Sequence, residues 1–431
     1  MSATLRMAAA FLAALSPAFA QDTLDPAFTK IPFDSWLTDR DQSPFQWSAR
    51  TSGGELANLQ RLRARVEITV DGNEVAKRQG HGELVFFVQF SDSDHRRYQS
   101  HGTIGLEEVN EAASKSNFVF TQNALAAPGD YRVAVGILDT KTGEHAALER
   151  MLHIGPLKND LLPDSFQGLP AVEFTEASDP PDGWFQPQLT GRLHLPLETR
   201  RDTRVQVLVN ASPSALGLKY RTGQVNNRSM ADVLPSLKVI SDLELKPGNL
   251  GVSVFDLTRR QVLFAQDRVD PRKEPLDWPR LRPALLEANP NKIDVHELTD
   301  REQNPQFFVE QVRRHISAGP APAAVIILSG PMGFPDGSDL RPIELAEKLE
   351  GRVFYLRYHP TPVRAPAVVS SRAYEGRRRG ISTLEPGFAV QEPLDQLEPL
   401  LKPLQPRVFD VYDPGQFRKA LAEIMKEIGR M

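Results

Sequence analysis

The second half of the chain alternates short apolar runs with segments of helical period, and this pattern constrains the fold more than any other feature. The run 324–328 (Ala-Val-Ile-Ile-Leu) has no polar position, which is typical of a strand covered on both faces. Comparable strands are expected at 205–210, 251–256, 262–265, 293–298, 324–329, 352–358 and 407–412. Because helical segments such as 302–316 separate several of these strands, residues 201–431 are predicted to form a doubly wound α/β sheet.

The helix nearest the C-terminus has the clearest local signals. Asp413 stands at its N-cap position and Pro414 at its first helical position. Phe417, Leu421 and Ile428 then belong to a single apolar stripe. We expect this stripe to pack against the sheet.

Residues 58–155 have period two instead of a helical period. Apolar and polar residues alternate over 62–70 and again over 131–137, which predicts strands with one wet face. Asp71-Gly72 is interpreted as a hairpin turn between two such strands. Several short strands with little helix predict an antiparallel, immunoglobulin-like β-sandwich.

Two further segments lack a regular period. Residues 21–57 carry scattered aromatic side chains and are interpreted as an N-terminal strap lying on the sandwich. Residues 156–200 contain seven prolines and are interpreted as a connector between the two domains.

The first twenty residues have the pattern of a secretory signal peptide. Arg6 precedes the apolar run 7–15, and Ala18-Phe19-Ala20 forms a small-x-small cleavage site. The run is much shorter than the roughly 20 residues that span a bilayer. We therefore expect cleavage after Ala20 and a secreted or periplasmic protein with no membrane span.

Composition excludes several classes of function. The chain has 51 basic and 55 acidic residues, so nothing in its charge indicates binding to nucleic acid or to an anionic membrane. It has no cysteine, which excludes disulfides, thiolate metal sites and a lipid-modified cysteine. No histidine pair has zinc-site spacing, and neither a nucleophile elbow nor a phosphate-binding loop is present.

The most informative motif follows the strand at 205–210. Asn210-Ala-Ser212-Pro-Ser214 stands at the carboxyl end of that strand, where open α/β sheets hold their ligands. Side-chain oxygens at this spacing resemble the Asp-x-Ser-x-Ser loop of von Willebrand factor type A (VWA) domains, which helps to hold a divalent cation.

The resemblance covers residues 201–431, in the order of the predicted strands and helices and in their apolar patterning. The stretches 234–240 (Leu-Pro-Ser-Leu-Lys-Val-Ile) and 254–264 (Val-Phe-Asp-Leu-Thr-Arg-Arg-Gln-Val-Leu-Phe) also carry it. The arrangement as a whole is similar to the VWA-related secreted proteins of acidobacteria. This resemblance implies a Rossmann-like domain in which three loops hold Mg²⁺: the Asp-x-Ser-x-Ser loop, a Thr after a middle strand, and an Asp after the fourth strand.

Both acids of that family pattern are replaced here. Ser212 and Ser214 match the first loop, but Asn210 stands in place of its Asp. Thr299 stands near the middle loop, and Ser329 stands where the second Asp belongs. Because Mg²⁺ requires carboxylate charge to offset its dehydration, we expect a degenerate site without a cofactor. In that case Ser212 and Ser214 cap the turn that follows the strand.

Two other groups near this edge are candidate contacts. Asp336 and Asp339 lie in the Gly- and Pro-rich loop after Ser329 and could offer carboxylates, although their spacing is unlike that of the family. Arg377, Arg378 and Arg379 form either a solvated loop or a contact for an acidic partner.

These observations favour a non-enzymatic protein that binds or scaffolds an unidentified protein partner. The contacts are expected in the loops 210–217, 299–305, 329–340 and 359–380, because binding residues favour loops on a rigid scaffold. One alternative is a Mg²⁺-dependent adhesin in which a partner's carboxylate completes the metal's ligands. A second is a hydrolase that uses an Asp/His pair in the sandwich, although no residue spacing specifies such a pair.

Overall fold

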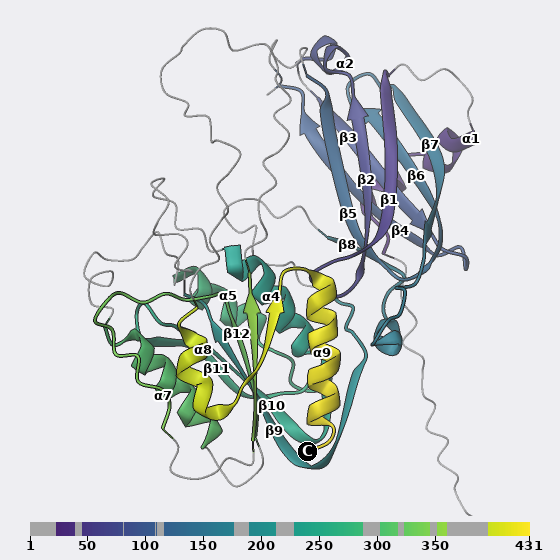
Figure 1. Cartoon of the computed structure of the whole chain (residues 1–431). Helices are drawn as coiled ribbons and strands as arrows, with labels where there is room; N and C mark the ends of the chain where they lie inside the picture. The colour runs from purple at the N-terminus through teal and green to yellow at the C-terminus, as the bar shows by residue number, and fades with distance from the viewer. Residues whose placement is uncertain are drawn as a thin grey trace, which may run out of the picture. The chain divides into compact units, whose positions relative to one another are not determined.

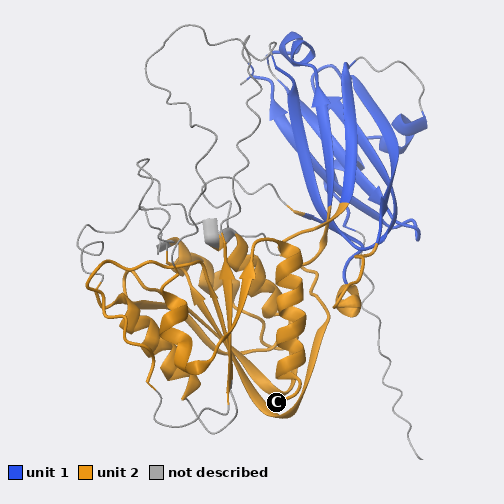
Figure 2. Cartoon of the chain, viewed as in Figure 1, with its two compact units in different colours: residues 1–53, 64–155, 168–174 blue, residues 54–63, 156–167, 175–431 orange. Residues whose placement is uncertain are grey.

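The computed structural model describes residues 23–38, 45–80, 82–107, 109, 116–175, 189–212, 228–287, 302–317, 323–344, 351–359 and 395–431. The chain divides into two compact units, shown in blue and orange in Figure 2. Unit 1 comprises residues 1–53, 64–155 and 168–174. Unit 2 comprises residues 54–63, 156–167 and 175–431.

Unit 1 is built on two antiparallel four-stranded sheets that form a β-sandwich-like pair (Figure 1). One sheet has the order β1 (Trp47–Leu56), β2 (Leu62–Val70), β5 (Phe118–Ala126), β8 (Val172–Thr175). The other has the order β4 (Arg97–Gly105), β3 (Glu83–Ser91), β6 (Gly129–Asp139), β7 (His145–Ile154). The predicted antiparallel strands are therefore confirmed.

The period-two pattern of β2 corresponds to its burial. Every second residue from Leu62 to Val70 is buried, whereas Arg63 and Arg65 are exposed. The prediction of a hairpin at Asp71-Gly72 is wrong. A short helix, α2 (Gly72–Lys77), begins there, and the Asp71 carboxylate caps it by accepting from the backbone N–H of Asn73 at 2.8 Å. The reason is topological, because β2 and β3 belong to different sheets and the chain must cross between them.

Aromatic side chains near the N-terminus pack on β3. A 3₁₀ helix, η1 (Pro26–Lys30), and α1 (Phe33–Thr38) contribute Phe28 and Phe33, which surround Phe87. The Phe28 and Phe87 ring centroids lie 5.0 Å apart in an edge-to-face arrangement, which adds to the stabilisation from burial alone. Gly136 on β6 makes room for Phe33, because a Cβ there would lie 2.7 Å from the ring.

Unit 2 contains one six-stranded sheet, with the order β11 (Gln261–Val269), β10 (Leu243–Asp256), β9 (Leu195–Asn210), β12 (Ala323–Ser329), β13 (Arg352–Tyr358), β14 (Arg407–Val411). The ladders from β10 to β14 are parallel, and β11 pairs antiparallel with β10 at one edge. Counted from β9, the order is 3-2-1-4-5-6, which reverses direction between β9 and β12.

Helices accompany this sheet, as the sequence predicts. They are α4 (Arg228–Ile240), α5 (Trp278–Glu287), α7 (Asn304–Ile316), α8 (Leu397–Leu401) with the 3₁₀ turn η5 (Lys402–Leu404), and α9 (Pro414–Ile428). In Figure 1, α7 and α8 lie on one side of the sheet and α9 on the other. The strand expected at 293–298 lies outside the described residues.

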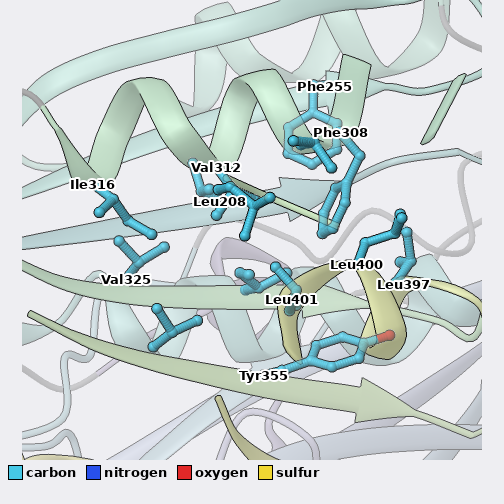
Figure 3. Packing of buried hydrophobic residues seen from close by; sticks show 14 of the residues in the cluster. Leu208, Phe255, Phe308, Val312, Ile316, Val325, Tyr355, Leu397, Leu400 and Leu401 are labelled. Atoms are coloured by element: carbon cyan, nitrogen blue, oxygen red, sulfur yellow. The ribbon is translucent and has the colours of Figure 1, made fainter. Parts of the chain in front are cut away.

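The core under α7 and α8 explains the apolar runs. Leu208, Val325 and Tyr355 project from three neighbouring strands toward Phe308 and Leu397 (Figure 3). Since the intervening strand residues are also buried, both faces of the sheet are covered. Each fully buried side chain of this kind contributes about 1.5–3 kcal/mol.

Helix α9 begins where the sequence predicts. The Asp413 carboxylate accepts from the backbone N–H of Gln416 at 2.8 Å, and Pro414 is the first helical residue. Phe417, Leu421 and Ile428 are buried. The local signals for this helix are confirmed.

Candidate functional site at the carboxyl edge of the six-stranded sheet

The candidate site lies where β9 and β12 end. These strands are parallel neighbours, so their last residues, Asn210 and Ser329, meet at the same edge of the sheet. Strand order reverses between them, and open α/β sheets place their ligand crevice at such a point. The Asn210 amide donates to Ser329 Oγ at 2.9 Å, and Ser329 Oγ donates to the Gly330 carbonyl at 2.7 Å. Both side chains are buried, so a neutral hydrogen bond spans the reversal point.

Ser212 connects this pair to the neighbouring strand. Its backbone N–H donates to Asn210 Oδ1 at 3.1 Å. Its hydroxyl donates to Asp256 Oδ1 at 3.3 Å and accepts from the Leu257 backbone N–H at 2.6 Å. The hydroxyl therefore joins the loop after β9 to the loop after β10.

Asp256, the last residue of β10, is a member of this network that the sequence reasoning missed. It is 1 % exposed, and Oδ1 accepts from the backbone N–H of Thr258 at 2.8 Å. Its Oδ2 accepts from Arg259 Nη1 at 3.0 Å. A buried carboxylate without a partner is strongly unfavourable, and here the guanidinium supplies the opposite charge. The signal in the sequence is an acid that ends a buried strand, with an arginine three residues later.

The residues at this edge do not fit a Mg²⁺ site. Mg²⁺ requires a near-octahedral set of oxygen ligands with carboxylate charge. Asn210, Ser212 and Ser329 use their polar atoms on one another and on the backbone, and Asp256 is neutralised by Arg259. Within the described part of the chain, no group of three or more His, Cys, Asp or Glu side chains is placed to hold a metal ion.

Among the described residues, no hydrogen bond joins the two acids in the loop after β12 to this network. Asp336 is exposed. Asp339 accepts from Arg341 Nε at 2.9 and 3.0 Å and from its Nη2 at 2.5 Å. The remaining predicted site residues, Ser214, Thr299, Arg377, Arg378 and Arg379, lie outside the described residues.

A second polar cluster lies beside the first. The Tyr355 hydroxyl donates to Asp395 Oδ2 at 3.0 Å, and the backbone N–H of Met332 donates to Asp395 Oδ1 at 3.2 Å. Burial raises the pKa of Asp395, although these bonds and nearby Arg357 act in the opposite direction. Arg357 Nε donates to Asp410 Oδ1 at 2.7 Å. Burial alone would raise the pKa of Asp410, but its hydrogen bonds from Arg357 and His359 lower that pKa.

Comparisons with known proteins leave the family of this chain open. No protein-family model matches it, and no curated protein matches it. A solved structure, Northeast Structural Genomics Consortium target SoR45, has 14% identity over 27% of this chain and 93% of its own, with a TM-score of 0.18. The putative ApaA protein from Bordetella pertussis has 13% identity over 27% of this chain and 98% of its own, with a TM-score of 0.16. Likenesses of this size carry no argument about fold or function.

Among the described residues, no helix combines the length and the apolar composition needed to cross a membrane.

Proposed function

We propose that this chain is a secreted or periplasmic, non-enzymatic protein that binds another protein. In this proposal an immunoglobulin-like sandwich precedes a VWA-like domain that has lost its metal site, and the loops at the carboxyl edge of the six-stranded sheet contact the partner. The observation that carries the loss of the metal site is the ion pair between Asp256 and Arg259, which balances a buried acid at this edge within the chain itself.

The strand order supports a doubly wound, Rossmann-like domain. A 3-2-1-4-5-6 sheet with helices on both sides is the arrangement in which ligands bind at the reversal point. Asn210 ends the first of these strands and Ser212 follows it, as in the Asp-x-Ser-x-Ser loop of the resemblance.

Electrostatics support the loss of the metal. A divalent cation at this edge would have to break the bond between Asn210 and Ser329, and it would approach the positive charge of Arg259. Neutral amide and hydroxyl oxygens do not offset the dehydration of Mg²⁺.

Exposed apolar side chains at the same edge support recognition of a protein. Leu340, in the loop after β12, is 41 % exposed, and Tyr412, directly after β14, is 39 % exposed. Tyrosine is one of the residues that dominate the binding energy of protein interfaces. The signal-peptide pattern of residues 1–20 supports export, and these residues lie outside the described part of the chain.

A thermal melt distinguishes this proposal from the Mg²⁺-dependent adhesin. A ligand that binds only the folded state raises the melting temperature. We expect the full chain to melt at the same temperature in EDTA and in millimolar Mg²⁺ or Mn²⁺. A concentration-dependent rise with either ion would contradict the loss of the metal site.

Cross-linking in the envelope fraction tests the partner-binding part. We expect Leu340→Asp combined with Tyr412→Ala to abolish a cross-linked species that the wild type forms. Met151→Asp provides the control, because Met151 is 69 % exposed but lies on β7 of unit 1. Loss of the species in the control, or its survival in the double variant, would argue against the carboxyl edge as the binding surface.

A further inference from the structure

A small pocket in unit 2 lies at the carboxyl edge where α4, β13, β14 and α9 come together. Its polar lining includes Asp232 and Ser236 from α4, Tyr358 from the end of β13, and Asp413 at the start of α9. Tyr412 also lines it. The free space is that of about one water-sized group.

The hydroxyl of Tyr358 has an unmet hydrogen-bonding requirement. Tyr358 is 1 % exposed, and its hydroxyl has no hydrogen-bond partner in the described part of the chain. Burial and the charge of Asp232 raise the pKa of this phenol, and Ser236 lowers it through an interaction that falls outside hydrogen-bond geometry. Buried polar groups in proteins almost always have a partner, and an oxygen left without one costs about 1–3 kcal/mol.

The carboxylate of Asp232 lines the same pocket, and its hydrogen-bond partner is uncharged. Its Oδ1 accepts from Asn58 Nδ2 at 2.7 Å, which is a neutral partner from the segment 54–63 of the same unit. Among the described residues no cationic side chain pairs with Asp232, and burial raises the pKa of its carboxyl group. The carboxylate of Asp413, which caps α9, adds a second negative charge to the lining.

We propose that this pocket binds a primary ammonium group, namely the ε-ammonium of a lysine on the partner protein. This inference rests on the proposed function, because it names the side chain of the partner protein that enters the pocket. An ammonium has a positive charge for Asp232 and up to three N–H donors for the carboxylate, the Tyr358 hydroxyl and Ser236. Tyr412, whose ring stacks on His359 with centroids 4.2 Å apart, also lines the pocket.

Size and ligand number argue against a guanidinium and a divalent metal ion. A guanidinium is planar and considerably larger than the water-sized space in the pocket. A divalent metal ion takes about six oxygen ligands, and the described residues contain no group of three or more His, Cys, Asp or Glu side chains placed to hold one. The compact ammonium head on a flexible stem fits both constraints.

The pocket can be tested without knowing the partner. Saturation-transfer NMR on the full chain would measure the dissociation constant of n-butylammonium, which represents the end of a lysine side chain. We expect binding in about the millimolar range, weakened by about tenfold or more in Asp232→Asn, which keeps the shape of the side chain and removes its charge. We expect Tyr358→Phe to weaken binding as well, and tetramethylammonium, which is larger and has no N–H, not to compete.

Two controls make the result decisive. Asp336→Asn removes one negative charge from an exposed position at the same edge and should leave the dissociation constant unchanged. Thermal melts should show that Asp232→Asn and Tyr358→Phe remain folded. Equal binding by wild type and Asp232→Asn, or no saturation transfer at about 50 mM amine, would overturn the proposal and leave the pocket to a water molecule. Because Tyr412 also lines the pocket, Leu340→Asp alone gives a cross-linking result that is independent of the pocket.

Discussion

The guanidinium of Arg259 donates to the carboxylate of Asp256 at 3.0 Å, within a single turn at the carboxyl end of β10. The Asp256 side chain is 1 % exposed and that of Arg259 is 13 % exposed, so the pair is largely removed from water. Opposite charges interact more strongly there than at the surface. The guanidinium of Arg259, rather than a bound ion, therefore balances the charge of Asp256 at this edge of the sheet.

Removing that cation should be costly. We expect Arg259→Ala to lower the free energy of unfolding of unit 2 by about 3–5 kcal/mol, because it leaves Asp256 buried without a charged partner. Urea denaturation would measure the change. Arg313→Ala is a matched control, since Arg313 pairs with Glu310 at the same sequence spacing but both side chains are 52 % exposed. The control should lose about 0–1 kcal/mol. Equal losses would mean that burial of the Asp256 pair has no special effect.

Restoring the acid of the metal-binding pattern should not restore the metal. An Asp at position 210 cannot donate to Ser329 Oγ, and it adds negative charge to a buried network. We therefore expect Asn210→Asp to lower the free energy of unfolding by about 1–3 kcal/mol. Millimolar Mg²⁺ should leave the melting temperature of this variant unchanged. Asn73→Asp, at an exposed position on α2, should alter stability by less than about 0.5 kcal/mol. A Mg²⁺-dependent rise confined to Asn210→Asp would show that one carboxylate is sufficient.

The ion pair between Asp160 and Arg418 should make the free energy of unfolding depend on pH in the acid range. Arg418 Nε donates to Asp160 Oδ1 at 2.6 Å and its Nη2 donates to Asp160 Oδ2 at 2.7 Å, both within unit 2. Burial alone would raise the pKa of Asp160, but the bonds from Arg418 bring it below the ordinary value. The stabilisation is therefore present above the unfolded-state pKa of about 3.9 and is lost as pH falls through the lower folded-state pKa.

Stability measured by urea denaturation across the acid range would test this sign. We expect Asp160→Asn to be less stable than wild type near neutrality, and the difference to shrink as pH falls below about 3.9. Asp395 is the contrasting case, because burial raises its pKa. Its contribution is present below the unfolded-state pKa and is lost as pH rises through the folded-state pKa. A pH dependence of the same sign for Asp160→Asn and Asp395→Asn would contradict these assignments.

The cap of α9 should have a measurable effect of its own. Asp413 accepts from the Gln416 backbone N–H, which otherwise has no partner within the helix. We expect Asp413→Ala to lower the free energy of unfolding by about 1 kcal/mol. Asp336→Ala, in an exposed loop, should change it by less than about 0.5 kcal/mol. If Asp413→Ala is as stable as Asp336→Ala, the cap does not contribute to stability.

The sequence predicts most of the described strands of the six-stranded sheet because the evidence for them is local. The apolar run 324–328 and the capped start at Asp413 specify β12 and α9 without reference to the rest of the chain. The hairpin predicted at Asp71-Gly72 fails for the opposite reason. Both residues favour tight turns in isolation, but whether a turn or a helix follows β2 depends on which sheet contains the next strand.

The candidate site divides in the same way. The apolar pattern of β9 and β12 shows where each strand ends. Asn210, Ser212 and Ser329 stand at those ends, so the sequence identifies them. Asp256 lies 44 residues from Ser212, and only the parallel pairing of β9 with β10 brings the two together. The sequence thus determined where strands end and which polar groups stand there. The tertiary structure decided which of those groups pair, because hydrogen bonds and ion pairs depend on neighbours in space, and the sheet's strand order sets those neighbours.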